Sequence, residues 1–184
     1  PIREESFEIV KELQRMGIEV AIITGDSEAA AKAVAGRLGI EKIFAGILPD
    51  EKAKIIRKFR VVERKNVAMV GDGINDAPAL AEANIGIAMG SGTDIAIHTA
   101  DVTLMKEGLR GVPKLVKLSK LTLKTIKENL FWAFIYNVIG IPIAAGVLYF
   151  FGGPLLNPMI ASLAMSLSSV SVVGNSLRLK ARAI

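Results

Sequence analysis

The sequence predicts an α/β domain with a doubly wound parallel sheet, followed by a two-helix transmembrane hairpin. Helical and short apolar segments alternate over residues 1–108. Two uncharged apolar stretches follow, at 130–151 and 155–177. One apolar segment, 67–70, opens directly into Gly-Asp-Gly. A strand that ends in such a turn is typical of a ligand site at the carboxyl edge of an open α/β sheet.

The first part consists of repeated strand–helix units. Phe7, Val10 and Leu13 recur at helical spacing, which indicates an amphipathic first helix. The strands are mainly apolar, as is usual when both faces of a parallel sheet are covered by helices. The expected helices cover 4–16, 28–39, 49–64, 76–83 and 93–100, and the expected strands cover 19–23, 42–45, 66–70, 85–88 and 102–104.

The second part has the pattern of a membrane hairpin. Residues 109–129 should form a basic stalk helix, because the lysines recur every three or four residues and share one stripe. The stretches 130–151 and 155–177 can each cross a hydrocarbon core of about 30 Å at about 1.5 Å per residue. Basic flanks, including the tail 178–184, place both ends in the cytosol. The alternatives are a buried hairpin of a large soluble protein and, for the lysines, mere contact with anionic lipid headgroups.

Composition narrows the classes of function. The 184 residues carry a net charge of +5 and a mean hydropathy of +0.43, which is too apolar for a purely soluble domain. There are no cysteines, which excludes disulfide frameworks and thiolate metal sites. The basic residues are not interleaved with aromatic residues, so nucleic acid is not an expected partner. The chain begins with Pro1 and shows no leader pattern, so we expect a piece of a longer protein.

The run Gly71-Asp72-Gly73-Ile74-Asn75-Asp76 is the strongest candidate site. Its glycines allow a close approach of backbone to ligand, and its two carboxylates are hard oxygen ligands suited to Mg²⁺. Asp76 is also expected to cap the following helix, with Pro78 in the first turn. The alternative is an ordinary strand–turn–helix link with solvated aspartates.

Two further loops point to phosphate chemistry. Thr24-Gly25-Asp26 ends a strand, where the hydroxyl and backbone N–H groups can hold a phosphoryl oxygen. Lys52 lies at a helix start, where a cation is unfavourable unless it faces an anion. A turn with a helix cap, and a solvated lysine, remain the alternatives. With Mg²⁺ these loops could neutralise charge on a phosphoryl group, but no suitable nucleophilic aspartate precedes them.

These motifs, together with Ala77-Pro78-Ala79-Leu80, resemble the phosphorylation domain of P-type ATPases, a Rossmann-like member of the haloacid-dehalogenase-like phosphotransferases. The resemblance implies that Thr24 and Lys52 contact an aspartyl phosphate, that Gly25 and Asp26 belong to the same loop, and that Asp72 binds Mg²⁺. Asn75 and Asp76 would complete the site.

The resemblance also shows what this sequence lacks. The phosphorylated aspartate of the family, in Asp-Lys-Thr-Gly-Thr, has no counterpart, nor does the ATP-binding domain; both would precede Pro1. The missing strand is central in this fold, so the sheet should be broken between the strands before Thr24 and Asp72. We expect the chain alone to be inactive and to need the rest of the pump as its partner.

Polar residues within the apolar stretches suggest a metal path. Tyr136 and Asn137 lie in the first stretch, and Met165 and Ser169 share a helix face in the second. Chemistry alone leaves Cu⁺ binding and helix packing both open. The four residues resemble signatures of copper-exporting P-type ATPases, which implies a transmembrane Cu⁺ site. The family's Cys-Pro-Cys ligands are absent, and the Lys and Asp expected of a zinc pump are also absent.

Our interpretation is therefore part of an ATP-driven Cu⁺ exporter, a multi-pass protein of the cell membrane. The resemblance implies a copper chaperone as a partner of the intact protein. The alternatives are a membrane-anchored, non-catalytic module for regulation or assembly, and a pump for Ag⁺ or Zn²⁺.

Overall fold

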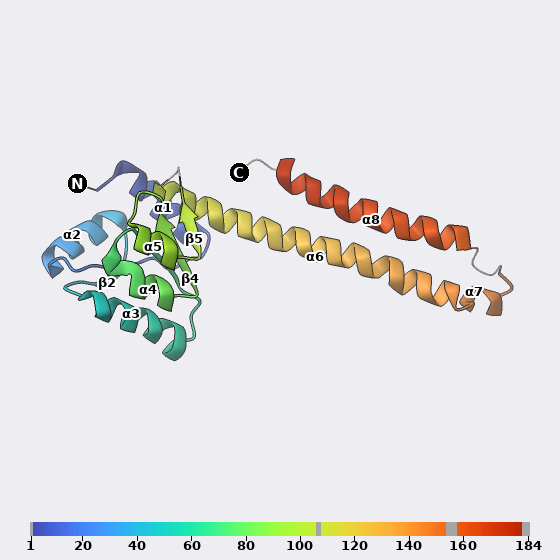
Figure 1. The fold of residues 1–184 in the computed structure, drawn as a ribbon, viewed down its shortest axis with the longest axis horizontal. Coiled ribbons are helices and arrows are strands. Elements are labelled where there is room, and N and C mark those ends of the chain that lie inside the picture. Colours follow the sequence, from blue (N-terminus) through green and yellow to red (C-terminus); the bar gives the residue numbers. More distant parts are fainter. Residues whose placement is uncertain (1, 106–107, 154–157, 182–184) are drawn as a thin grey trace. The chain divides into compact units, whose positions relative to one another are not determined.

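The computed structural model describes residues 2–105, 108–153 and 158–181. Its contacts divide the chain into two units, 1–114 and 115–184, which are considered separately below. The first unit holds all the strands of the described chain, and the second holds most of the long helix α6 together with α7 and α8. Figure 1 shows these elements.

The first unit alternates strands and helices, as predicted. Its elements are α1 (Glu4–Arg15), β1 (Ala21–Ile23), α2 (Glu28–Leu38), β2 (Lys42–Phe44), α3 (Pro49–Arg57), a π-helix (Lys58–Val62), β3 (Ala68–Gly71), a 3₁₀ turn (Ile74–Asp76), α4 (Ala77–Glu82), β4 (Ile85–Met89), α5 (Asp94–Thr99), β5 (Val102–Leu104) and a second 3₁₀ turn (Gly108–Arg110).

The strands form two parallel sheets rather than one. β1 pairs with β2, and β3, β4 and β5 form a three-stranded sheet in that order. Within the described chain no strand joins β1 to β3. We call this interruption the sheet break. It was expected from the sequence, and it leaves one edge of β1 and one edge of β3 without a neighbour among the described strands.

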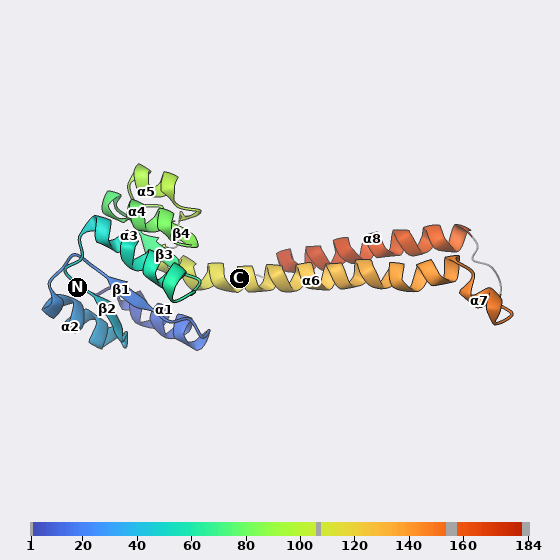
Figure 2. The ribbon, with the colours of Figure 1, turned by 90° about the horizontal axis from the view of Figure 1, so that it is seen from below.

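The two sheets nevertheless share packing contacts. Ile23 of β1 and Met69 of β3 both pack against one buried cluster formed by Ile56, Ala79 and Ala83. Figure 2 shows α3, which carries Ile56, between the β1–β2 part and the part with β3 and β4. This shared cluster holds β1 and β3 on either side of the sheet break.

An exposed ionic cluster joins the two sheets at their amino-terminal ends. Glu19, just before β1, lies 2.8 Å from Lys65, which precedes β3, and 2.7 Å from Lys42 of β2. Hydrogen bonds from Lys42 and Lys65 lower the pKa of Glu19 to about 2, and the bond to Glu19 raises the pKa of Lys65. The starts of β1 and β3 meet here, and further along the strands Ile23 and Met69 pack against one cluster, so the two strands run in the same direction.

Two local expectations were wrong. The α-helix expected over 49–64 ends at Arg57, and the chain continues as a π-helix to Val62. In this π-helix, Arg60 donates a hydrogen bond to the Glu82 carbonyl (2.7 Å) and pairs with the Glu82 carboxylate (2.7 Å). Asp76 stands at the N-cap position of α4 but makes no side-chain cap bond. Its carboxylate is paired with Lys52 instead.

The second unit is a helical hairpin. α6 (Gly111–Ala144) begins in the first unit and is followed by α7 (Val147–Phe150) and α8 (Pro158–Ala181). α6 and α8 run side by side in Figures 1 and 2. Asn129 donates to Ser176 Oγ (2.8 Å), and Asn175 donates to Asn129 Oδ1 (2.9 Å) and Glu128 Oε2 (3.2 Å).

The expected transmembrane helices differ from the helices observed. The stretch 130–151 is not one helix, because α6 ends at Ala144 and Gly146 has φ 87°, a left-handed conformation that breaks the helix before α7. The start of the stretch 155–177 and the end of the tail 178–184 lie outside the described residues; α8 begins at Pro158. Among the described helices, none combines the length and the apolar character needed to cross a bilayer.

Candidate active site

Lys52 and Asp76 form a direct, mostly buried ion pair. Lys52 Nζ lies 2.7 Å from Asp76 Oδ1, and their side chains are 14% and 15% exposed. Lys52 comes from the first turn of α3, and Asp76 ends the 3₁₀ turn after β3. The pairing accounts for a lysine at a helix start, where a cation would otherwise be unfavourable. It brings together two residues that are 24 positions apart in the sequence.

The Thr24 loop is tied to the start of α3. Thr24 Oγ1 accepts a hydrogen bond from the Asp26 amide at 3.1 Å, which closes a tight turn after β1. The backbone N–H of Ile47 donates to the Thr24 carbonyl at 3.0 Å, and that of Gly46 donates to the Asp26 carbonyl at 2.8 Å. Gly25 and Asp26 are exposed. The segment that leads into Lys52 is thus fixed against Thr24.

The Asp72 turn is supported by a loop that the sequence analysis did not single out. The Thr93 backbone N–H donates to the Asp72 carbonyl at 2.8 Å, and Thr93 Oγ1 caps α5 by accepting from the Ala96 amide at 3.4 Å. A Cβ on Gly92 would lie 2.6 Å from the Asp72 carbonyl oxygen, so only glycine fits there. The signal was present in Gly-Ser-Gly-Thr-Asp, which follows a strand at the same sheet edge.

Close backbone approach also holds the Asp76 side chain. A Cβ at Gly71 would lie 2.7 Å from Asp76 Cβ and 2.9 Å from Asp76 Oδ2. Asp76 therefore folds back over the end of β3, where it meets Lys52. The side chains of Asp72 and Asn75 remain exposed.

These loops lie at the carboxyl ends of the strands on either side of the sheet break. Thr24 follows β1, the Asp72 turn follows β3, and the Gly92–Thr93 loop follows β4. Because β1 and β3 point the same way, the loops that carry the hydroxyl, carboxylate and ammonium groups lie at one edge. That edge can bind an anion with Lys52 and backbone N–H groups, and a cation with Asp72.

The oxygen ligands at this edge fit a Mg²⁺ site in which a phosphoryl group supplies some of the ligands. In the described part of the chain, no group of three or more Asp, Glu, His or Cys side chains could hold a metal by itself. Mg²⁺ sites of phosphoryl-transfer enzymes commonly use one or two carboxylates, with water and phosphate oxygens as the remaining ligands. The exposed Asp72 carboxylate meets that requirement, whereas Asp76 is already occupied by Lys52.

Known proteins resemble this chain in both sequence and fold. Residues 1–84 match the family described as haloacid dehalogenase-like hydrolase. The chain is 56% identical over 180 residues to a copper-exporting P-type ATPase of Legionella pneumophila, covering 98% of this chain and 24% of that protein. It is 51% identical over 180 residues to a silver exporting P-type ATPase of Salmonella typhimurium, covering 98% and 22%. A solved zinc-transporting PIB-type ATPase in its E2.Pi state matches with a TM-score of 0.84 and 39% identity, over 97% of this chain and 28% of that one.

The chain is homologous to copper-transporting P-type ATPases over 98% of its length. Its first part has the haloacid-dehalogenase-like fold predicted from the three loops. The chain spans about a quarter of the length of the curated relatives described above. Because the match to the Legionella protein covers 98% of this chain, the homology extends beyond residues 1–84, which match the haloacid-dehalogenase-like family, into α8.

The four residues assigned to a Cu⁺ site stay a prediction. Tyr136 and Asn137 lie on α6, and Asn137 Nδ2 donates to the Ala133 carbonyl of its own helix at 2.8 Å. Met165 and Ser169 lie one turn apart on α8, where Ser169 Oγ donates to the Met165 carbonyl at 3.3 Å. Met165 is 73% exposed, so its thioether is accessible.

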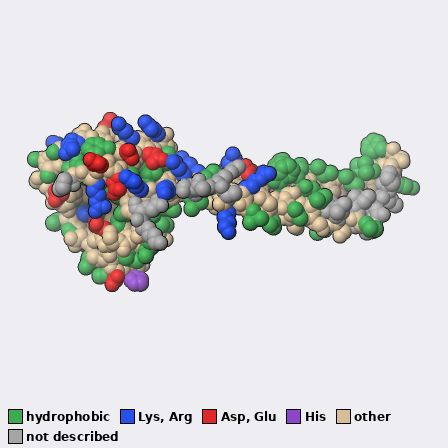
Figure 3. Space-filling model, turned by 90° about the horizontal axis from the view of Figure 1, so that it is seen from above, with side chains coloured by type: hydrophobic (Ala, Val, Ile, Leu, Met, Phe, Trp, Pro, Cys, Tyr) green, Lys and Arg blue, Asp and Glu red, His purple; other side chains and the backbone are tan. Residues whose placement is uncertain are grey.

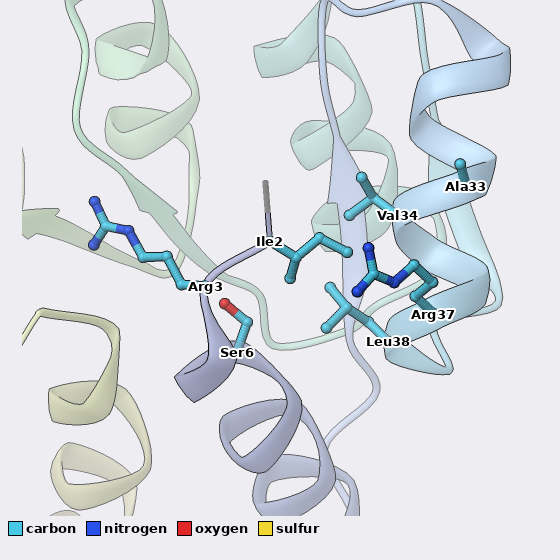
Figure 4. Close-up of a pocket in the computed structure, with 7 residues that line it drawn as sticks. All are labelled: Ile2, Arg3, Ser6, Ala33, Val34, Arg37 and Leu38. Carbon is cyan, nitrogen blue, oxygen red and sulfur yellow. The ribbon is translucent and has the colours of Figure 1, made fainter.

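A separate hollow in the first unit contains none of the predicted site residues. It measures about 430 Å³ and lies between the start of α1 and helix α2. Figure 4 shows Ile2, Val34 and Leu38 together, with Arg3 directed away from them. Since it lacks carboxylates and hydroxyls other than that of Ser6, it does not resemble a phosphoryl site.

Proposed function

We propose that this chain forms the Mg²⁺ and aspartyl-phosphate site of an ATP-driven Cu⁺ export pump. The observation that carries the proposal is the Lys52–Asp76 pair beside the sheet break, with the Thr24 and Asp72 loops at the same edge. A strand bearing the phosphorylated aspartate would fill the break and complete the site. The printed sequence contains no Asp-Lys-Thr-Gly-Thr motif, so that strand would come from a segment outside residues 1–184.

Each loop would have one task around the phosphoryl group. Lys52 and the Thr24 hydroxyl would orient its oxygens, with Gly25 and Asp26 shaping the turn. Asp76 would hold Lys52 in position, and Asn75 would complete the polar edge beside it. Asp72 would bind Mg²⁺, which when bound neutralises charge on the phosphoryl oxygens. ATP would be the phosphoryl donor, bound by a domain outside this chain.

The cargo proposed is Cu⁺. Met165 offers a soft thioether on the same helix face as Ser169, and Tyr136 and Asn137 supply further polar atoms on α6. The Legionella relative is named for copper, whereas the Salmonella relative is named for silver and the solved structure for zinc. Ag⁺ fits the same thioether. The printed sequence has no Lys or Asp in 130–151 or 155–177 for a Zn²⁺ site.

The hairpin would lie in the cell membrane, with the first unit in the cytosol. Large apolar side chains such as Phe134 (60% exposed), Val138 (63%) and Val170 (67%) lie on its surface. Apolar surface of that extent is unusual for a protein in water. Cations at the outer ends of the hairpin favour cytosolic ends. A copper chaperone would deliver Cu⁺ to the intact pump.

The test is reconstitution of phosphoenzyme. The chain would be purified in detergent with and without the segment of the Legionella relative that precedes its matched region, and then incubated with labelled ATP, Mg²⁺ and Cu⁺. We expect no phosphoenzyme from the chain alone and Cu⁺-dependent phosphoenzyme from the mixture. Asp72→Asn should abolish the signal, and Met165→Leu should remove only its Cu⁺ dependence.

The competing function is a non-catalytic module for membrane assembly or regulation. The sheet break favours it if the break accepts a strand from another subunit without the aspartate. In that case the mixture would form a stable complex but no phosphoenzyme. Asp72→Asn would then leave complex formation unchanged.

A further inference from the structure

Polar contacts between α6 and α8 show which residues of the two helices lie at the same height along the hairpin. Asn129 meets Ser176, and Asn175 meets Asn129 and Glu128. The two helices run in opposite directions through these contacts. Moving two residues along α8 from Ser176 and two residues back along α6 from Asn129 therefore reaches the same level, about 3 Å away.

Four cations lie at that level or slightly beyond it, within about 8 Å of the Asn129–Ser176 contact along the helix axes. Lys124 and Lys127 of α6 and Arg178 and Lys180 of α8 are all exposed; we call them the basic band. The Glu128 carboxylate lies 4.0 Å from Lys124 and accepts a hydrogen bond from Asn175 at 3.2 Å. Figure 3 shows Lys and Arg side chains gathered at one end of the hairpin and hydrophobic side chains along the rest.

The surface changes character directly beyond the basic band. Leu130, Phe131 and Trp132 follow on α6 at 55%, 59% and 45% exposed, and Val173 and Val170 follow on α8 at 57% and 67%. Exposed cations next to exposed apolar and aromatic side chains are the order found where a helix passes from headgroups into acyl chains. Trp132 is the only tryptophan in the sequence.

We propose that the basic band is a binding surface for anionic phospholipids, and that it selects phosphatidylglycerol-type headgroups over zwitterionic ones. This rests on the membrane placement proposed above. The headgroup phosphate and its net negative charge would pair with the basic band, while the acyl chains would lie along Leu130, Trp132 and Val173. Free headgroup phosphate lacks the apolar contacts and should not replace the lipid.

Trp132 supplies the measurement, because it lies five residues from Lys127 on the same helix. The whole chain would be reconstituted in vesicles of phosphatidylcholine that contain dibrominated phosphatidylglycerol or dibrominated phosphatidylcholine at equal mole fractions. Bromine quenches tryptophan fluorescence on contact. We expect the brominated anionic lipid to show a relative binding constant higher by about fivefold, a preference that rising salt reduces.

The variant that tests the assignment is the quadruple change Lys124→Gln, Lys127→Gln, Arg178→Gln and Lys180→Gln. This variant should bind the two brominated lipids equally, so that the relative binding constant falls to about one. The matched control removes four exposed cations of the first unit, as Lys11→Gln, Lys32→Gln, Lys54→Gln and Lys58→Gln, and should retain it. Circular dichroism would verify that both variants keep their helix content.

The outcomes separate the two proposals. Equal quenching by both brominated lipids would overturn the basic band while supporting membrane placement. No quenching by either lipid would overturn the membrane placement and, with it, the basic band. Loss of the preference on adding excess glycerol phosphate would assign the cations to a soluble phosphate ester and would also overturn the lipid proposal.

Discussion

The ion pair of Lys52 and Asp76 contributes both to the stability of the first unit and to the proposed site. Both side chains are mostly buried, so each depends on the other to offset the cost of leaving water. Their geometry also fixes the ammonium group at the sheet edge, where the proposed phosphoryl group would lie. A stability effect and an activity effect should therefore accompany each other at this position.

Lys52→Met should lower the free energy of unfolding by about 1–3 kcal/mol, because it leaves the Asp76 carboxylate buried without its partner. Urea unfolding of the chain in a nonionic detergent measures the change. The control is Lys32→Met, whose side chain is 65% exposed in an i,i+4 pair with Glu28 and should cost less than about 0.5 kcal/mol. Equal effects of the two substitutions would contradict a structural role for the buried pair.

Glu19 should make the first unit sensitive to acid. Its pKa is lowered to about 2 in the folded chain by hydrogen bonds from Lys42 and Lys65. A carboxylate with a depressed folded pKa contributes stability that is present above the unfolded pKa and lost as pH falls toward the folded value. The melting temperature should therefore fall between pH 5 and pH 2.5, and the fall should be smaller in Glu19→Gln.

Salt and a second variant test the cause of that pH dependence. The cluster is exposed, so added salt should weaken the contribution of Glu19. Glu8→Gln, at an exposed position on α1, provides the comparison. If the pH dependence of Glu19→Gln matches that of the unsubstituted chain, the cluster does not link the two sheets energetically.

Among the elements, the turn after β3 is the most tightly packed part of the site. Gly71→Ala would bring a methyl group to within 2.7 Å of Asp76 Cβ, and so would displace the carboxylate from Lys52. We expect a loss of about 1–3 kcal/mol in unfolding free energy. Gly36→Ala, on α2 with open space around it, should instead stabilise by about 0.5–1 kcal/mol.

Thermal unfolding of the two alanine variants measures both effects. Opposite signs for Gly71→Ala and Gly36→Ala are the expected result. A neutral Gly71→Ala would mean that Asp76 can leave its position freely, which would remove the argument that it fixes Lys52.

Apolar patterning was sufficient to predict the order of strands and helices in the first unit. The Thr24 and Asp72 loops were located because each follows an apolar strand, and Lys52 was located because a cation stands at a helix start. The sheet break was predicted only through the resemblance to a known fold, since local pattern carries no information about a strand that is absent. The π-helix over Lys58–Val62 was missed because the contact that accompanies it, between Arg60 and Glu82, is a tertiary one that local sequence does not reveal.

The pairing of Asp76 with Lys52 was missed for a similar reason. Asp76 stands where a capping residue belongs, and only the fold reveals a cation nearby. The hairpin shows a different limit. An uncharged stretch gives no sign of where a helix ends, and the left-handed Gly146 divides 130–151 into two helices.

At the scale of the whole molecule, the absence of cysteine offers a direct test of membrane placement. A single cysteine introduced as Val138→Cys should be unreactive toward a membrane-impermeant maleimide, because acyl chains would cover it. In cells that produce the chain, Lys32→Cys should react with the maleimide only after permeabilisation, as expected of a cytosolic first unit. Ready labelling of Val138→Cys in intact cells would contradict the proposed placement.

The account depends on β1 and β3 accepting a strand between them. Backbone alternation directs the Ile23 and Val70 N–H groups away from β2 and β4, because Thr24 donates to Phe44 and the Val67 carbonyl accepts from Asn84 and Ile85. Residue-resolved hydrogen exchange of the chain, with and without the preceding segment of the Legionella relative, measures their protection. We predict rapid exchange at Ile23 and Val70 in the chain alone and strong protection in the mixture; unchanged exchange in a mixture that forms phosphoenzyme would contradict the account.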